Sequence, residues 1–400
     1  MRESRLKLAV VCSHPIQYYA PLFRALARET DLTVFFCHRQ SAGAQAAAGF
    51  GVAFEWDVDL MSGYQSEFLD NVSARPNVST FGGCDTPDIG ERLRQGFDAV
   101  LLTGWHLKCH WQAVLACRRL KVPVMVRGDS RLGTRRGSAK LAVKKLLYPR
   151  MLRLFAACAY VGQDSRAYYL HYGVPDERLY FSPHTVDNAR FSSAATLLTR
   201  DMARQRLGVS PEAYIILFAG KVLTSKRPFD LVRAAALMQA SHPGTVQVLV
   251  AGDGPARNQL EAAALEAQVV LRVLGFRNQS EMPAVYRAAD VLVLPSEETW
   301  GLVANEALAC GVPVVASNAC GCARDLLLDG RAGRVYPFSD IPALAQALSA
   351  VREAPPSAGD INARANEYAP ERAAAGIVAA GHAVVDEYRR AASHGRGIRV

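Results

Sequence analysis

Short, continuous apolar runs recur along the chain and alternate with longer segments rich in alanine and leucine. Such runs are typical of parallel strands covered on both faces, because a strand with one solvated face would alternate apolar and polar residues. We expect strands at residues 6–12, 32–37, 99–103, 122–127, 157–161, 214–218, 246–251, 269–274, 291–294 and 312–316. The segments between them, such as 111–120 and 230–240, have the length of helices. The predicted fold class is therefore α/β, with doubly wound parallel sheets.

The strand–helix pattern starts again in the middle of the chain. After Tyr180 comes a Pro-His-Thr-Val-Asp-Asn stretch, then a polar, alanine-rich segment through Leu207 that predicts one helix, then a fresh strand. A chain of 400 residues is also too long for one ordinary core. We predict two Rossmann-like domains facing a cleft, an N-terminal one over 1–190 and a C-terminal one over 195–368. A last helix at about 370–400 is expected to cross back to the first.

Charge is distributed unevenly. The net charge is +9, yet residues 130–163 contain no Asp or Glu. The eight basic residues of this segment are Arg131, Arg135, Arg136, Lys140, Lys144, Lys145, Arg150 and Arg153. Interleaved with leucines, they indicate a helical surface for anionic lipid headgroups over residues 130–153. A solvated helix face, or a lining for a phosphate-bearing substrate, is the alternative. No nucleic-acid-binding motif accompanies the charge.

The cysteines and the N-terminal sequence indicate in which cellular compartment the protein is expected. The nine cysteines are odd in number and form no CxxC pair, which favours reduced thiols over a disulfide scaffold or a metal site. The first apolar run is too short for a signal peptide, and no apolar stretch is long enough to span a bilayer. We expect a cytoplasmic protein that can associate with the inner face of the cytoplasmic membrane. Asp57-Val58-Asp59 spells a metal-binding DxD, but it precedes the strand context that motif needs, so we expect no metal.

The densest candidate chemistry lies in the segment 295–316. A buried strand ends at Pro295, a loop carries Glu298, Gly301 permits a close backbone approach, and a short helix containing Glu306 runs to Gly311. A helix N-terminus favours phosphate, and a carboxylate nearby can hold a ribose diol. The alternative is structural, with Glu298 as a dipole partner and Glu306 as a solvent-facing charge.

A second constellation follows the strand at 214–218. Gly220 opens a turn that presents Lys221 and then Lys226, before a helix begins after Pro228. Two ammonium groups on one loop can stabilise a leaving diphosphate. Solvated surface lysines are the alternative. The nearby Gly252-Asp253-Gly254 is too weak a glycine pattern to indicate a cofactor clamp.

Taken together, Gly220-Lys221…Lys226, Gly252-Asp253-Gly254-Pro255, Pro295-Ser296 and Glu298-x7-Glu306 resemble the donor-binding domain of retaining GT-B glycosyltransferases of family 4 (group 1), of the bacterial polysaccharide-assembly type. The resemblance is strong over about residues 175–350 and weaker in the first half. It implies that Lys226 contacts the donor diphosphate, that Glu298 lies near the donor sugar, and that Glu306 holds the ribose. Lys221 stands where the family more often has arginine.

The resemblance also indicates less specific positions. It places the nucleobase near Phe276 and Arg277, and the diphosphate near Gly301. His14 replaces part of the usual glycine loop and is a candidate for the donor phosphates. His106 resembles the family histidine near the reacting centre by position alone, and a satisfied loop histidine is the alternative. Arg127 and Asp129 follow the next strand and are acceptor or donor-sugar candidates, with a mutual ion pair as the alternative.

The expected activity is metal-independent, retaining sugar transfer from a nucleotide-diphosphate sugar, which is the substrate and the only cofactor-like group. The acceptor would be a glycan, a lipid-linked sugar or a small molecule, in cell-surface polysaccharide or glycoconjugate biosynthesis. The catalytic candidates are Lys226, Glu298 and His106. The alternatives are a sugar-nucleotide 2-epimerase on the same fold and a catalytically inactive nucleotide-binding relative.

Overall fold

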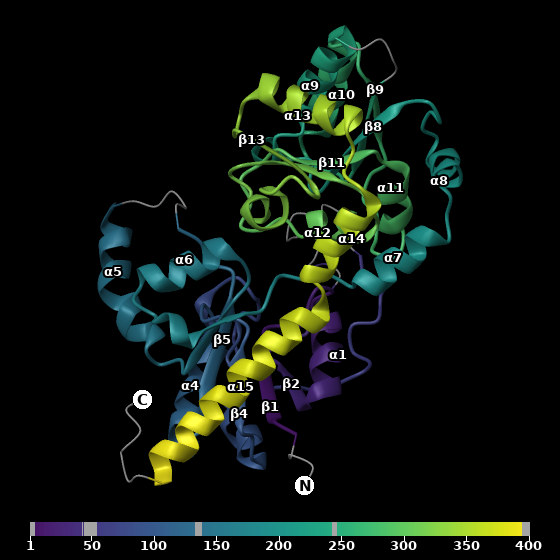
Figure 1. The fold of residues 1–400 in the computed structure, drawn as a ribbon. Helices are drawn as coiled ribbons and strands as arrows, with labels where there is room; N and C mark the ends of the chain where they lie inside the picture. Colours follow the sequence, from purple (N-terminus) through teal and green to yellow (C-terminus); the bar gives the residue numbers. More distant parts are fainter. Residues whose placement is uncertain (1–4, 42, 44–53, 133–137, 242–245, 394–400) are drawn as a thin grey trace. The chain divides into compact units, whose positions relative to one another are not determined.

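The computed structural model describes residues 5–41, 43, 54–132, 138–241 and 246–393, and the chain forms two compact units (Figure 1). The first unit comprises Met1–Gln40, Asp59–His184 and Pro370–Val400, and the second comprises Ser41–Val58 and Thr185–Ala369. Each unit is built on one parallel sheet with helices, which confirms the predicted α/β, Rossmann-like fold class. The segment Ser41–Val58 differs from the sequence-based division, because it groups with the second unit.

The sheet of the first unit has seven parallel strands in the order β3-β2-β1-β4-β5-β6-β7. They are β1 (Lys7–Cys12), β2 (Asp31–Phe36), β3 (Gln65–Phe68), β4 (Ala99–Leu102), β5 (Val124–Gly128), β6 (Ala157–Tyr160) and β7 (Leu179–Phe181). The five predicted strands of this half are all present, and β3 and β7 are additional. Those two are short and only partly buried, so they lack the continuous apolar run on which the prediction depended.

The helices of the first unit are α1 (Ala20–Glu29), α3 (Ile89–Arg92), α4 (Lys108–Leu120), α5 (Ser138–Leu152), α6 (Gln163–His171) and α15 (Pro370–Ser393). The C-terminal α15, yellow in Figure 1, contacts α1 and the strands β4, β6 and β7. Its small residues allow a close approach: a Cβ on Gly376 would lie 1.8 Å from the carbonyl oxygen of Phe181, and one on Gly381 would lie 2.4 Å from the Cδ2 of Leu6. The core of this unit therefore includes the end of the chain.

The sheet of the second unit has six parallel strands in the order β10-β9-β8-β11-β12-β13. They are β8 (Tyr214–Ala219), β9 (Val246–Ala251), β10 (Val270–Val273), β11 (Val291–Leu294), β12 (Val314–Ser317) and β13 (Gly333–Tyr336). The five predicted strands are present, and β13 is additional. The strands β9, β11 and β12 are buried along their whole length, as expected for strands covered on both faces.

The helices of the second unit are α7 (Asn188–Thr196), α8 (Arg200–Leu207), α9 (Phe229–Ser241), α10 (Arg257–Glu266), α11 (Met282–Ala288), α12 (Val303–Ala309), α13 (Ile341–Glu353) and α14 (Ala358–Glu367). The prediction of one helix up to Leu207 is wrong, because the segment forms α7 and α8. Asp187 caps α7, and the Thr199 hydroxyl accepts a hydrogen bond from the Met202 N–H to start α8. A second N-cap inside the segment begins a new helix.

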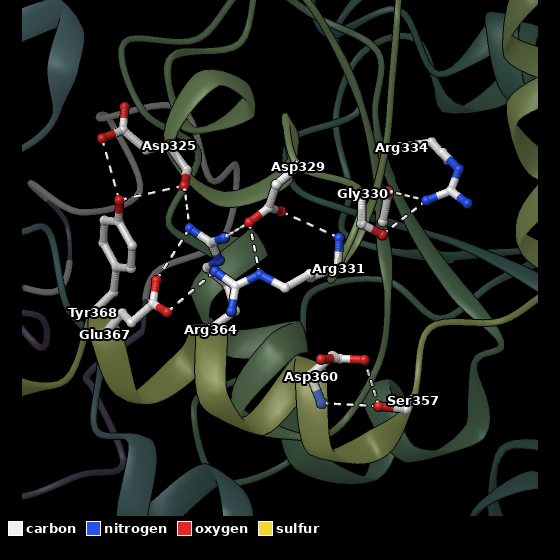
Figure 2. A network of polar contacts seen from close by, with 11 residues as sticks. Asp325, Asp329, Gly330, Arg331, Arg334, Ser357, Asp360, Arg364, Glu367 and Tyr368 are labelled. Atoms are coloured by element: carbon white, nitrogen blue, oxygen red, sulfur yellow. Dashed lines mark hydrogen bonds and ion pairs between the residues drawn. The ribbon is translucent and has the colours of Figure 1, made fainter.

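A network of arginines and carboxylates attaches α14 to the loops around β13 (Figure 2). Arg364 donates to the carbonyl oxygen of Asp325 (2.7 Å) and forms ion pairs with Asp329 and Glu367. Arg331 forms ion pairs with the same two carboxylates. Arg364 is buried, whereas Arg331, Asp329 and Glu367 are partly exposed, so the outer ion pairs contribute little to stability.

Candidate functional site

Each sheet has one point where the strand order reverses, and loops from that point are where open α/β sheets bind ligands. In the first unit the reversal lies between β1 and β4, and in the second it lies between β8 and β11. The sequence candidates His14 and His106 follow β1 and β4, whereas Lys221 and Glu298 follow β8 and β11. The topology therefore groups the candidates of each unit at its own switch point.

In the second unit, Lys226 and Glu298 form a direct ion pair across the switch point. The Lys226 Nζ lies 2.6 Å from Oε1 and 2.7 Å from Oε2 of Glu298, and the Ser296 hydroxyl donates to the same carboxylate at 2.7 Å. Both charged side chains are partly exposed, at 33% and 21%. The structure thus brings together two predicted site residues that are 72 positions apart in the chain.

Lys221 lies in the electrostatic field of Lys226. Partial burial and the neighbouring ammonium lower the pKa of Lys221 from its ordinary value. Two cations held close together on one loop repel each other unless an anion offsets their charge. The pair is therefore suited to a ligand with more negative charge than the single Glu298 carboxylate supplies.

The glycines of this region serve close backbone packing. A Cβ on Gly252 would lie 1.8 Å from the carbonyl oxygen of Gly220, and Gly252 has a φ of +151°. A Cβ on Gly321 would lie 1.9 Å from the carbonyl oxygen of Thr299, in the loop that follows Glu298. Backbone hydrogen bonds join the Gly220 N–H to Ala251 and the Gly321 N–H to Glu298. These contacts account for the Gly-x-Gly pattern without a bound cofactor.

Glu306 is buried, so its alternative role as a solvent-facing charge is wrong. Only 1% of the residue is exposed. The Tyr286 hydroxyl donates to one carboxylate oxygen at 2.6 Å, and the Gln279 amide donates to the other at 3.3 Å. Glu306 is buried where α12 packs against α11. No pattern in the sequence indicates that α11 contacts Glu306. Gly301, the other candidate of this loop, has a φ of +104°.

Phe276 and Arg277 lie on the loop between β10 and α11. The Phe276 ring packs against Phe54, with 4.4 Å between ring centroids. Arg277 donates to Glu281 at 2.7 Å and to the carbonyl oxygen of Leu274 at 3.1 Å. The Asn278 amide donates to the backbone of Glu55 at 2.7 Å. Residues near Phe54 thus contact this loop. No local sequence pattern predicts a contact between segments so far apart in the chain.

The DxD residues are engaged in ordinary polar contacts. The Asp57 carboxylate accepts hydrogen bonds from the backbone and hydroxyl of Ser280. Asp59 accepts from the backbone N–H groups of Met61 and Ser62. Asp57 therefore contacts the loop between β10 and α11 within the second unit.

In the first unit the candidates line one cavity of about 350 Å³. Its lining includes His14, His106, Arg127, Asp129 and His184. A volume of this order matches the lower range of small-molecule sites, about 300–1,000 Å³. The structure therefore brings together all four first-domain candidates and adds His184.

Two histidines of this cavity, His14 and His106, have hydrogen-bonding partners nearby. Burial, reinforced by nearby His38, lowers the pKa of His14 to about 4, and its Nδ1 lies 3.0 Å from the Ser13 hydroxyl. His106 Nε2 lies 3.3 Å from the carbonyl oxygen of Val78, which can only accept, so this contact requires a proton on Nε2. Neutral imidazoles can both donate to and accept from hydroxyl groups. Such groups suit a polyhydroxylated ligand.

Arg127 supplies a positive charge to the cavity. It does not form the ion pair with Asp129 that was the alternative interpretation. Arg127 is 2% exposed, and it donates to the Ser182 hydroxyl (3.0 Å) and to the carbonyl oxygen of Pro183 (2.7 Å). Asp129 instead lies 3.9 Å from His184. Burial and the charge of Arg127 hold the pKa of His184 well below its usual range, so that contact joins a carboxylate to a neutral ring.

The described residues contain no cluster of three or more His, Cys, Asp or Glu side chains with the geometry of a metal site. All nine cysteines are buried and unpaired. Burial raises the pKa of Cys12 to about 11 and those of Cys117 and Cys158 to about 12, so these thiols are poor nucleophiles.

Part of the sequence matches a known protein family. Residues 199–372 match the family of glycosyl transferases group 1. A D-inositol 3-phosphate glycosyltransferase of Geodermatophilus obscurus is 36% identical over 242 residues, which is 57% of this chain and 52% of that protein. One from Arthrobacter sp. (strain FB24) is 34% identical over 230 residues, or 54% of this chain and 53% of that protein. The chain thus matches about half the length of these curated relatives.

Solved structures share the fold across both units. A glycosyltransferase from Rickettsia africae has a TM-score of 0.71 at 14% identity, covering 96% of this chain and 99% of its own. Anabaena HepE, solved in complex with UDP and glucose, has a TM-score of 0.64 at 16% identity, covering the same shares of the two chains. At these identities the likeness shows the fold alone. The second unit is therefore similar in sequence to the glycosyl transferases of group 1, and the chain shares the fold of these solved structures over nearly its whole length.

Proposed function

We propose that this protein is a retaining glycosyltransferase that moves a sugar from a nucleotide-diphosphate donor, bound by the second unit, to a hydroxyl-bearing acceptor, bound in the cavity of the first unit. The observation that carries the proposal is the contact of Lys226 with Glu298 at the β8–β11 switch point. An ammonium that can bind a diphosphate and a carboxylate that can bind sugar hydroxyls then lie side by side, which supports the proposal. Relatives named as glycosyltransferases, and a protein of the same fold solved with UDP and glucose, support the donor class.

In the proposed reaction the bond between the sugar C1 and the donor phosphate oxygen breaks, and its electron pair leaves on that oxygen. Lys226 and Lys221 offset the charge that develops on the diphosphate, which is the largest catalytic contribution we expect here. The acceptor oxygen forms a bond to C1 on the face the diphosphate leaves, and its proton passes to the departing phosphate oxygen. Protein ammonium groups supply the positive charge, so we propose that no metal is required.

Glu298, Glu306, Phe276 and Arg277 complete the proposed donor side. Glu298 would accept hydrogen bonds from the sugar hydroxyls, exchanging its contact with Lys226 for one shared with the ligand. Glu306 would orient the ribose, and the loop of Phe276 and Arg277 would contact the base. On the acceptor side, His106 and His14 can bind hydroxyl groups, and Arg127 supplies a fixed charge. This division assigns most of the predicted site residues to one of two ligands.

A nucleotide panel followed by a transfer assay tests the proposal. We expect one nucleoside diphosphate to raise the melting temperature of the protein, since a ligand of the native state stabilises it by mass action. Donor sugar should then appear on an acceptor with retained anomeric configuration by NMR, with and without a chelator. No shift with any nucleotide would point instead to an inactive relative. Release of a free nucleotide-sugar epimer without an acceptor would identify an epimerase.

A membrane surface is part of the proposed function, because the acceptor of such an enzyme can be lipid-linked. On α5, Val143, Leu146 and Leu147 are 56%, 61% and 52% exposed, and their spacing places them on one face of the helix. The basic residues Lys145 and Arg150 on the same helix are exposed too. Residues 133–137 of the basic segment lie outside the described residues. No helix in the described part of the chain is both long and apolar enough to cross a bilayer.

We expect the wild-type protein to co-sediment with phosphatidylglycerol vesicles at low salt, and much less with phosphatidylcholine vesicles or at high salt, because screening weakens charge attraction. Leu146→Ser with Leu147→Ser should reduce binding several-fold, since each exposed leucine gains apolar burial in the bilayer. Leu115→Ser, at a leucine of α4 that is 54% exposed, is the matched control and should bind like the wild type. Equal binding to neutral and anionic vesicles would contradict an electrostatic surface.

A further inference from the structure

The second unit has another cavity, of about 250 Å³, to which neither the switch point nor the comparisons assign a ligand. It is lined by α7, α8, β10, the loop after β10 and α11. Arg277 is the one residue it shares with the proposed donor side. Its volume is below the range of about 300–1,000 Å³ that is typical of drug-sized ligands. The cavity therefore fits a small molecule better than a nucleotide.

Three arginines line this cavity, namely Arg206, Arg272 and Arg277. Arg206 and Arg272 are exposed at the cavity and form no hydrogen bond or ion pair with any residue in the described part of the chain. Arg272 reaches the C-terminal end of α8 because Gly208 has no side chain: a Cβ there would lie 3.3 Å from the Arg272 Nη2. Two guanidinium groups thus line one cavity, where Arg206 interacts electrostatically with Glu281 without a direct ion pair.

The third guanidinium is only partly satisfied. Arg277 donates through its two terminal nitrogens to Glu281 (2.7 Å) and to the Leu274 carbonyl (3.1 Å), while its Nε is buried and has no partner among the described residues. The acids that face the group are Glu281, which lines the cavity, and Asp57, which contacts Ser280 at its rim. The Glu281 carboxylate already accepts from Arg277 and from the Asn278 N–H. The arginines therefore outnumber the acids that could neutralise them.

We propose that this cavity binds a small phosphomonoester, with the phosphate held by Arg206 and Arg272. A guanidinium presents a planar fork of donors that matches phosphate oxygens bidentately. The cavity also has apolar walls at Leu198, Leu207 and Pro283, which can contact a small organic body attached to the phosphate. The proposal does not depend on the proposed donor site, since neither arginine belongs to it.

Calorimetric titration of the full chain with glucose 6-phosphate tests this site, with glucose as the uncharged comparison. We expect binding of the phosphate ester and none of glucose. Arg206→Ala with Arg272→Ala should weaken binding about 10- to 100-fold, from the usual value of hydrogen bonds to charged groups. Arg272→Lys should retain part of the affinity, because it keeps the charge and loses the fork. Both arginines are exposed, so melting curves should show that these variants fold.

Two control variants locate the binding. Arg233→Ala removes an exposed arginine of α9 that does not line the cavity, and it should bind like the wild type. Lys226→Ala disables the proposed donor site and should also leave glucose 6-phosphate binding unchanged. The proposal is overturned if the wild type does not bind, if the double arginine variant binds as tightly as the wild type, or if Lys226→Ala abolishes binding. That last result would place the phosphate in the donor site.

Discussion

Lys226→Ala is expected to lower the rate of sugar transfer by about 100- to 1,000-fold, the usual cost of removing one group that stabilises charge in a transition state. The ammonium touches both oxygens of Glu298 and lies close enough to Lys221 to lower the pKa of that lysine. A diphosphate that binds between the lysines would relieve their repulsion. Removing Lys226 deletes that stabilisation at the moment the leaving charge develops.

The loss should appear in kcat as well as in kcat/KM, because the charge on the diphosphate grows in the transition state. The fold should remain intact, since Lys226 is one-third exposed and the Ser296 hydroxyl still donates to Glu298. Arg331→Ala is a matched control: it removes a half-exposed cation that forms ion pairs with Asp329 and Glu367 in the network with α14 (Figure 2). It should transfer sugar at the wild-type rate.

Steady-state rates and melting curves of the two variants decide the prediction. A Lys226→Ala enzyme with unchanged turnover would refute the proposed role of the lysine. A variant that loses activity only because it unfolds would show a lowered melting temperature. The melting temperature of Arg331→Ala then shows how much stability is lost when a surface ion pair is removed. Lys226→Arg should keep part of the rate, since the positive charge stays while its geometry changes.

The pairing of Lys226 with Glu298 follows from sequence because parallel strands end at one edge of a sheet. The motifs after the strands at 214–218 and 291–294 were enough to predict a common site, since β8 and β11 are neighbours at the switch point. The strands themselves were predictable where both faces are covered. The strands β3, β7 and β13, with partly exposed residues, give no such signal.

Contacts between distant segments could not be predicted in this way. The packing of Phe54 on Phe276 joins two segments of the second unit that are more than 200 residues apart in the sequence. The hydrogen bonds from Tyr286 and Gln279 to Glu306 depend on how α11 and α12 pack, which no local pattern encodes. Sequence therefore indicates which residues carry the chemistry, whereas tertiary packing decides which of them are buried and which partners hold them.

Variants of Glu306 can separate its role in stabilising the fold from its proposed role in ligand binding. Glu306→Ala would leave the buried Tyr286 hydroxyl and Gln279 amide without these acceptor oxygens, so we expect a loss of about 1–3 kcal/mol in the free energy of unfolding. Glu306→Gln keeps the shape and one acceptor oxygen, and its amide can donate to the Tyr286 hydroxyl. Its stability should therefore stay near that of the wild type.

Donor binding should respond differently from stability. If the carboxylate orients the ribose as proposed, Glu306→Gln should weaken binding of the nucleoside diphosphate about tenfold or more, because a carboxylate accepts from both diol hydroxyls and an amide does not. Tyr286→Phe, which removes one hydrogen bond to the same carboxylate without replacing it, is the matched control and should affect stability more than nucleotide affinity. A Glu306→Gln protein that binds nucleotide like the wild type would show that Glu306 supports only the packing of α12 against α11.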